Sequence, residues 1–100
     1  MATRKNNPIS AELDWDEDKN IFNKKDHGSS FEEGATVFND PLAVTDNDEE
    51  HSIKEQRLKA IGYSSAGKLL RVSFTVRNDK FRIFSVRAPS RSERQKYEED

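Results

Sequence analysis

The sequence predicts an α+β fold, in which two N-terminal helices precede an antiparallel β-meander and a C-terminal helix. Residues 70–77 alternate between apolar and polar side chains, which is typical of a strand with one apolar face. Helix-capping residues mark two segments before residue 40 and one segment after Pro89. Helices that are segregated from a run of strands indicate the α+β class.

A hairpin covering residues 70–87 is the strongest element of this pattern. Asn78 and Asp79 tolerate positive φ and suit a tight turn between its two strands. The second strand does not alternate cleanly. Its residues divide into two mixed sets, one of Phe81, Ile83 and Ser85 and the other of Arg82, Phe84 and Val86. We therefore expect this strand to lie inside the sheet with both faces covered.

Arg82 would then emerge from an apolar face, where an unpaired charge is costly. Either a carboxylate of the same chain or a phosphate of a ligand could pair with it. The sequence leaves these two alternatives open.

The N-terminal part begins with a polar tail, residues 1–12, followed by a single domain over residues 13–100. A short strand is expected near residues 13–15. Asp16 is a suitable N-cap for a helix over about 17–25, which Gly28 would terminate. In that helix Ile21 and Phe22 are expected to face the core.

Ser30 and Glu33 match a capping box that opens a second helix, over about residues 31–39. Its apolar positions follow helical spacing: Phe31, Ala35 and Phe38. Gly34 is expected to weaken this helix slightly.

The middle of the chain continues with a short strand at 42–45, a charged loop at 46–52 and a strand at 56–63. In the last of these, Leu58 and Ala60 share one face, and Arg57 and Lys59 share the other. A second capping box, Ser90 to Glu93, opens the C-terminal helix, which is expected to run to about residue 98.

Composition narrows the class of protein. The chain has 100 residues and no cysteine, which excludes disulfides and thiolate metal sites. No apolar run approaches the ~20 residues of a membrane span, and no signal peptide is visible at the start. We therefore expect a cytoplasmic protein that uses neither a metal nor a cofactor.

Charge is unevenly distributed along the chain. Residues 1–50 carry five Lys/Arg and thirteen Asp/Glu, whereas residues 51–100 carry twelve Lys/Arg and six Asp/Glu. A basic half of this kind suggests a polyanionic or acidic partner. The alternative is that the two halves neutralise each other within one small domain.

The side chains present are compatible with RNA cleavage. When the neighbouring 2′-hydroxyl attacks, the protein must supply cations around the phosphate and moderate acid–base help. Arginine presents a fork that matches phosphate oxygens, and His27, His51 and Glu55 could transfer protons. Composition does not separate this activity from simple binding of RNA or of an acidic protein.

Four stretches of the chain resemble the BrnT family of small toxins from type II toxin–antitoxin systems, in the order and spacing of that family. They are LDWDEDKN (13–20), HGSSFEEGATVFNDPLA (27–43), HSIKEQRLKAIGYSSAGKLLRVSFTVR (51–77) and FRIFSVRAPSRSERQKYE (81–98). The resemblance covers the chain from about residue 13 to its end.

The resemblance implies a RelE-like fold, with helices packed on one face of a small antiparallel sheet. It implies a ribonuclease that inhibits translation by cutting RNA. It also implies a BrnA-like antitoxin with a ribbon-helix-helix domain, through which the complex would bind operator DNA and repress its own promoter. A dimeric antitoxin would give a complex of two toxins and two antitoxins.

The family's patterns also indicate site residues in this chain. Three arginines are expected to clamp the scissile phosphate: Arg57, Arg82 and Arg87. Two histidines are candidates for proton transfer: His27 and His51. Three further basic residues are expected to contact RNA: Lys25, Lys59 and Arg71. Three residues of the C-terminal helix are expected to contact the antitoxin: Arg91, Arg94 and Tyr97.

Purely structural explanations for these residues also stay open. His27 beside a C-cap glycine suits capping or packing, His51 suits a solvated loop, and the C-terminal helix suits a solvated face. The chain also departs from the family's usual Lys-His-Gly, because Asp26 stands before His27 and Gly28. The protein is therefore either an active ribonuclease, a weak or inactive relative that acts as an antitoxin-binding co-repressor, or a nucleic-acid-binding module.

Overall fold

The structure is a computed structural model that describes residues 12–48 and 55–99. In chain order the elements are the strand β2 (Glu12–Trp15), the helices α1 (Glu17–His27) and α2 (Phe31–Ala35), the 3-10 helix η2 (Thr36–Asn39), the strands β3 (Val44–Asn47), β4 (Arg57–Tyr63), β5 (Leu69–Arg77) and β6 (Lys80–Arg87), and the helix α3 (Arg91–Glu99). Within these residues no helix is both long enough and apolar enough to cross a bilayer.

The strands form one five-stranded sheet in the order β2-β6-β5-β4-β3. The last four strands pair antiparallel, as predicted, whereas β2 runs parallel to β6 at the sheet edge. The α+β class is confirmed, and so is the short strand expected near residues 13–15, but its parallel pairing with β6 makes the sheet mixed. Leu13 and Trp15 of β2 are partly buried against the core.

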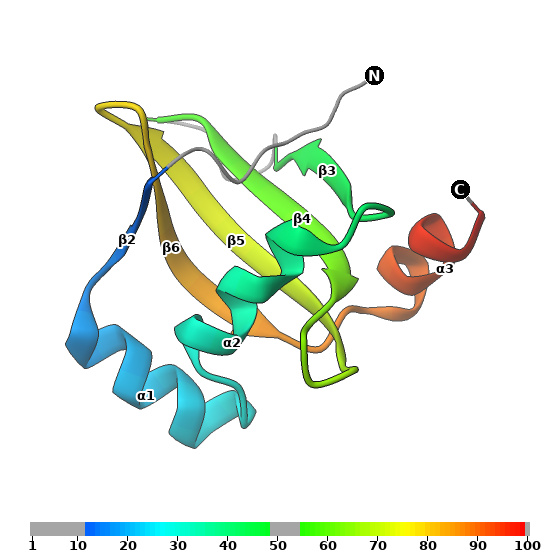
Figure 1. The fold of residues 1–100 in the computed structure, drawn as a ribbon, viewed down its shortest axis with the longest axis horizontal. Coiled ribbons are helices and arrows are strands. Elements are labelled where there is room, and N and C mark those ends of the chain that lie inside the picture. The colour runs from blue at the N-terminus through cyan, green and yellow to red at the C-terminus, as the bar shows by residue number, and fades with distance from the viewer. Residues whose placement is uncertain (1–11, 49–54, 100) are drawn as a thin grey trace.

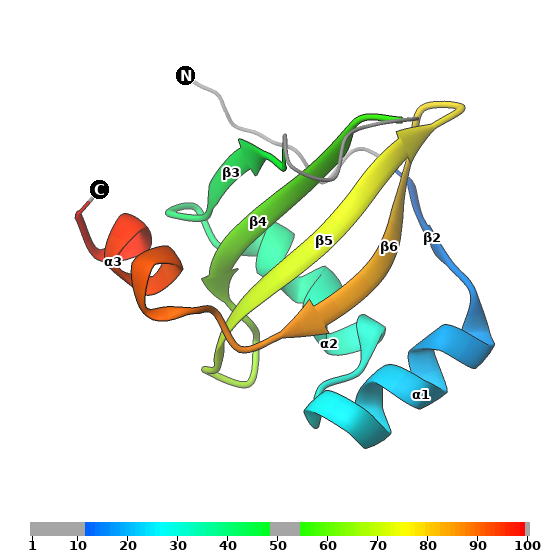
Figure 2. The same cartoon turned by 180° about the vertical axis from the view of Figure 1, so that it is seen from behind.

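The two faces of the sheet differ (Figure 1, Figure 2). α2 crosses one face and α1 lies beside β6. Seen from behind, the strands lie in front of α2, and α3 stands at the side of β4. We call the face away from α2 the open face. The implied arrangement of all helices on one face is therefore incomplete, since α3 is tied to residues of the open face, as described below.

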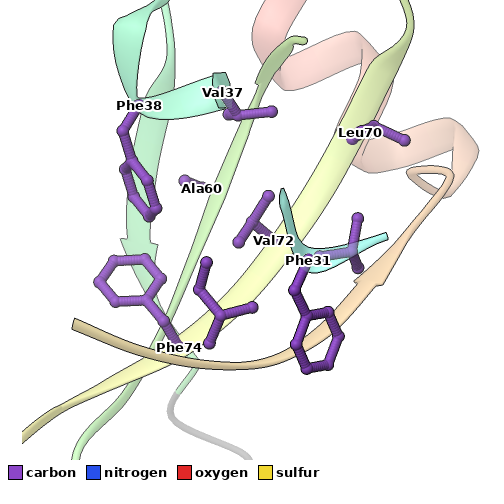
Figure 3. Close-up of a cluster of buried hydrophobic side chains, with 9 residues drawn as sticks. Phe31, Val37, Phe38, Ala60, Leu70, Val72 and Phe74 are labelled. Atoms are coloured by element: carbon purple, nitrogen blue, oxygen red, sulfur yellow. The ribbon is translucent and has the colours of Figure 1, made fainter. Parts of the chain in front are cut away.

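The core fills the space between α2 and the sheet (Figure 3). Phe31, Val37 and Phe38 come down from α2 and η2 onto the strands. They meet a set of buried sheet residues, which includes Ala60, Leu70, Val72 and Phe74. Phe38 and Phe74 pack edge to face, with ring centroids 5.1 Å apart. The predicted apolar face of the second helix is thus confirmed, although its last turn is a 3-10 helix.

The prediction for the interior face of α1 is wrong. The caps are as expected, since Asp16 Oδ1 accepts a hydrogen bond from Lys19 N and Gly28 adopts a φ of 82°. However, the side chains of Ile21 and Phe22 are 62% and 66% exposed, whereas Asn20 and Asn23 are buried. The prediction placed Ile21 and Phe22 inside because they are apolar. It did not take into account that buried backbone groups at this interface need the amides of Asn20 and Asn23.

Those two amides join α1 to its neighbours by hydrogen bonds. Asn23 Oδ1 accepts a bond from Val86 N, and its Nδ2 donates to Val86 O and Ser29 O. The side chain thereby pairs with the backbone of β6 as another strand would. Asn20 Oδ1 accepts a bond from Phe31 N at the start of α2. Buried backbone groups need such partners, so a polar side chain is required at this interface.

α2 approaches the sheet at Gly34. A Cβ placed on this glycine would lie 2.5 Å from Val86 Cγ2. A hydrogen at this position therefore lets the helix reach β6, and the slight weakening predicted from helix propensity accompanies a packing requirement.

A β-bulge interrupts the pairing of β5 and β6. Ser73 pairs with Ser85 while its neighbour Phe74 pairs with Ile83, so Phe84 is an extra residue in β6. The bulge changes the alternation, because Val86 now joins Phe81 and Ile83 on the core side. The prediction that Ser85 shares a face with Ile83, and Val86 with Arg82, is therefore wrong. The strand is covered by α2 on one face only.

The remaining elements agree with the sequence to within a few residues. Asn78 and Asp79 both have positive φ, 51° and 64°, which confirms the tight turn. The strand expected at 42–45 begins at Val44 and extends to Asn47, into the segment expected as a loop. The second capping box forms in full, since Ser90 and Glu93 exchange two bonds, whereas at the first Ser30 Oγ accepts from Glu33 N and the Glu33 carboxylate accepts from Ser64 Oγ.

The buried amides and exposed apolar side chains of α1 predict how substitutions there change the free energy of unfolding. Asn23→Ala should lower the free energy of unfolding by at least about 2 kcal/mol, because it leaves buried backbone groups without partners. In a domain of this size that corresponds to a melting temperature lower by roughly 8–16 °C. Ile21→Ala, which removes an exposed apolar side chain two positions away, should change it by less than about 0.5 kcal/mol. Thermal denaturation of both variants checks this, and an equal loss would contradict the assignment.

The close approach at Gly34 predicts a coupled pair. Gly34→Ala should destabilise the protein by about 1–3 kcal/mol through overpacking, although alanine is the better helix former by roughly 1 kcal/mol. In a Val86→Ala background the colliding methyl groups are absent, so Gly34→Ala should then be neutral or stabilising. Urea denaturation of the four proteins gives the coupling energy. Additive effects would show that the two residues do not constrain each other.

Candidate functional site

Basic side chains gather on the open face in rows set by the strand register. Arg57 of β4 and Arg82 of β6 both pair with Thr75 of β5, so the two arginines flank it in one row. Neighbouring strands lie about 4.8 Å apart, which places the two arginine Cα atoms about 10 Å from each other. Two long side chains at that spacing can converge on one group above Thr75. We call Arg57, Thr75 and Arg82 the arginine row.

Each arginine of the row has a partner that holds it in place. Arg82 Nη1 lies 2.6 Å from Asp14 Oδ2 of β2, so one alternative for Arg82, pairing with a carboxylate of the chain, is observed. Both side chains of this pair are about one-third to one-half exposed, and such pairs contribute at most about 1 kcal/mol. Arg57 stacks on Phe84, with its Cζ 4.8 Å from the ring centroid. The bulge places Phe84 within reach of Arg57.

A second group of cations surrounds Glu93 of α3. Its carboxylate lies 3.2 Å from Arg71 Nε, 3.4 Å from Lys59 Nζ and 3.4 Å from Arg87 Nη1. We call these four residues the Glu93 cluster. It attaches α3 to β4, β5 and β6 from the open face.

Arg71 is the most enclosed cation of the cluster. Its side chain is 13% exposed and also lies 3.3 Å from Asp48 Oδ2. Its Nε faces Glu93 without hydrogen-bond geometry, so this buried N–H is held by charge alone. An arginine enclosed in this way stabilises the fold and is poorly accessible to a ligand.

The carboxyl group of Glu93 stays ionised because of its neighbours. Burial would raise its pKa, but the hydrogen bond from Ser90 N and the charges of Arg71, Arg87 and Lys59 lower it below the usual value. A negative charge is therefore kept among three positive ones, and the cluster is a structural ion network at neutral pH.

α3 has a second attachment through Tyr97. The Tyr97 hydroxyl donates to Asp40 Oδ2, and Tyr63 N donates to the same oxygen. Burial and this bond raise the pKa of Tyr97 to about 12. Lys96 also pairs with Asp46 of β3. Tyr97 therefore has a structural role, while Arg91 and Arg94 are exposed on the same helix.

His27 is the last residue of α1, which packs beside β6. Its Nε2 is 3.3 Å from Asp26 Oδ2, and its side chain is 39% exposed. It lines a hollow of about 420 Å³ together with Phe22 and Phe84. Lys25 is exposed on α1. His51 lies outside the described residues.

The structure thus divides the predicted site residues into separate places. Arg57 and Arg82 share the arginine row. Lys59, Arg71 and Arg87 share the Glu93 cluster, so Arg87 is removed from the row. His27 stands beyond Phe84, whose role sequence analysis missed. The signal for Phe84 was present as an aromatic residue that broke the strand alternation, but a bulge cannot be located from one strand alone.

Chemically, the arginine row can bind a phosphodiester and stabilise charge that develops on it. Guanidinium groups are permanently charged and bidentate toward phosphate oxygens. Cleavage by a neighbouring 2′-hydroxyl asks for such stabilisation, together with a proton acceptor and donor. Asp14 beside the row, and His27 and Asp18 in the lining of the hollow, are groups that could exchange protons.

Two comparisons with known proteins found a match, one to a family and one to a fold. Residues 15–93 match the family model described as "Ribonuclease toxin, BrnT, of type II toxin-antitoxin system". The crystal structure of the Brucella abortus ribonuclease toxin BrnT superposes with a TM-score of 0.61 and 23% sequence identity, covering 81% of this chain and 99% of that chain. This likeness shows the fold. The chain matches no curated protein sequence.

The Glu93 cluster predicts a specific pH dependence. The folded-state pKa of Glu93 is below that of the unfolded chain, about 4.3, so its contribution is present above that value and lost as pH falls further. Glu93→Gln should therefore lower stability at pH 7, by about 1.5–3 kcal/mol for a charged hydrogen-bonded group. It should also flatten the decline of stability below about pH 4.3.

Denaturation curves between pH 7 and pH 3 check this prediction, with Glu98→Gln on the exposed part of α3 as the matched control. The control should keep the wild-type pH dependence. If Glu93→Gln followed the same curve as wild type, the cluster would contribute nothing to the docking of α3.

Proposed function

The chain belongs to the BrnT family of ribonuclease toxins of type II toxin–antitoxin systems, and we propose that it cuts RNA at the arginine row and so inhibits translation. The observation that carries this proposal is the register that sets Arg57 and Arg82 on either side of Thr75. Both arginines belong to the face that α2 does not cover, so a single-stranded RNA could lie across it.

In the proposed mechanism the two arginines bind the scissile phosphate from opposite sides. As the ribose 2′-hydroxyl attacks phosphorus, negative charge grows on the non-bridging oxygens, and the guanidinium groups stabilise it. Arg82 can exchange its partner Asp14 for phosphate, because that pair is partly exposed and weak. Asp14 would then be available beside the row to accept a proton. His27 is the candidate that protonates the leaving 5′-oxygen.

The Glu93 cluster contributes positive potential rather than direct contact in this proposal. Three cations against Glu93 and Asp48 leave an excess of one positive charge beside the row. Such a potential raises the rate of encounter with a polyanion. Lys25, which is exposed on α1, would contact RNA directly, and of the cluster cations Arg87 and Lys59 are more exposed than Arg71.

The toxin–antitoxin context implies a partner protein. We propose a ribbon-helix-helix antitoxin, a complex of two toxins with two antitoxins, and repression of their own promoter through the antitoxin. Arg91 and Arg94 on the exposed side of α3 are the proposed contacts, because an antitoxin that holds a toxin of this kind is expected to be acidic there. The site of action would be the cytoplasm.

One feature favours a weaker second candidate. Asp26 places a carboxylate next to His27, where the family usually carries a lysine. If a lysine at that position assists RNA binding, this chain would be a weak nuclease that acts mainly with its antitoxin as a co-repressor.

Substitutions in the arginine row test the proposal. Arg57→Ala and Arg82→Ala should each lower RNA cleavage by about 100-fold or more, the usual effect of removing one transition-state donor. The melting temperature of Arg82→Ala should change by only a few degrees, because its ion pair is exposed. Arg77→Ala is the matched control, since Arg77 is an exposed arginine of β5 that pairs with Glu55 at the turn end of the sheet.

Growth arrest on induced expression, with and without the neighbouring gene, completes the test. Arrest by wild type that the neighbouring gene and the Arg82 substitution both relieve would support a toxin with its antitoxin. Full activity in both row variants would remove the row from the mechanism. Folded wild-type protein that neither arrests growth nor cuts RNA would support the co-repressor instead.

A further inference from the structure

An aromatic hollow lies between α1 and β6, next to the arginine row. Phe22 of α1 and Phe84 of β6 both line it, and its volume is about 420 Å³. This volume lies in the range of small-ligand sites, roughly 300–1,000 Å³. Lys19 and His27 add basic groups, while Asp18 and Ser85 add groups that can form hydrogen bonds.

Phe22 has no role in the packing of the described residues that would explain it. Its side chain is 66% exposed, and Asn23 makes the attachment of α1 to β6. A single exposed phenylalanine would be ordinary, but Phe22 lines the hollow together with the half-buried Phe84, and apolar surface gathered in this way marks an interaction site. Ile21, which is 62% exposed on the same helix, does not line this hollow.

Phe84 connects the hollow to the arginine row. Its ring borders the hollow and also carries the guanidinium of Arg57 at 4.8 Å from the ring centroid. The bulge is responsible, because it brings both Phe84 and Ser85 beside the open face. The phosphate-binding groups and the aromatic groups therefore form one continuous surface.

We propose that this hollow binds a nucleobase of single-stranded RNA, by stacking on Phe22 and Phe84, next to the phosphate held by the arginine row. The proposal rests on the function proposed above. Aromatic side chains beside cations are the usual means by which proteins hold unpaired bases, because every base has a π-face and every nucleotide a charge. Lys19 lines the hollow and Arg57 lies on the Phe84 ring, so two cations stand near the proposed base, with Asp18 also in the lining.

The arrangement would orient the substrate as well as bind it. A base fixed in the hollow restrains the ribose attached to it, and with it the 2′-hydroxyl that must align with phosphorus. His27, which lines the same hollow, would then stand beside that nucleotide. Binding of a base in the hollow would therefore make the arginine row prefer RNA chains whose bases are unpaired.

Binding of two oligomers of equal charge tests the proposal. The first is a fluorescently labelled 2′-O-methyl RNA 12-mer of mixed sequence, which cannot be cut by its own 2′-hydroxyl. The second is a 12-mer of the same backbone in which every base is replaced by hydrogen. Wild type should bind the first more tightly, and Phe22→Ala should lose roughly 5- to 100-fold in affinity for it, the effect of one stacked base.

Matched variants distinguish stacking from a general loss of apolar surface. Phe22→Trp should retain affinity because it keeps an aromatic face, and Ile21→Ala should bind like wild type. Phe22→Ala should bind the base-free oligomer as wild type does. The three variants should melt within a few degrees of one another, because both side chains are exposed.

Three outcomes would overturn the inference. Wild type could bind both oligomers equally, Phe22→Ala could match Ile21→Ala, or Phe22→Ala could keep RNA affinity while losing the antitoxin, which would make Phe22 part of a protein interface. Failure of the proposed function looks different. In that case wild type cuts no RNA, while the preference for the base-containing oligomer can still be measured.

Discussion

Both N-terminal helices contact the sheet at Val86. The amide of Asn23 pairs with its backbone N–H and C=O, and Gly34 lets α2 approach its side chain. Val86 is itself fully buried. Hydrogen bonds fix α1 along β6 while steric contact fixes the distance of α2. Because these two constraints meet at one point, the position of both helices depends on the local conformation of β6.

The conformation of β6 depends in turn on the bulge at Phe84. One extra residue returns Val86 to the core and leaves Arg82, Phe84, Ser85 and Arg87 available to the opposite side. The same irregularity therefore completes the core and builds the open face. A regular strand would have placed Val86 toward solvent and disrupted the attachment of both helices.

The open face separates cations that hold the fold from cations that can meet a ligand. Around Glu93, charge is enclosed and matched, and the result is a fixed α3. Along the arginine row, Arg82 pairs with a partly exposed carboxylate and Arg57 stacks on an aromatic ring. Under the proposed function, this difference separates the arginines that would bind RNA from the cations that hold α3 in place.

The sequence by itself determined the α+β class, the tight turn at Asn78–Asp79, the N-caps Ser30 and Ser90 and the family, because each depends on local chemistry or on motif order. It also placed Arg57 and Lys59 on the face opposite Leu58 and Ala60. Only the tertiary structure decided which arginines share a row, since strand register fixes that. It also decided that Asn23 faces inward while Phe22 faces outward. Sequence periodicity describes only where apolar side chains recur. It does not show that the backbone of a distant strand needs hydrogen-bond partners from the helix.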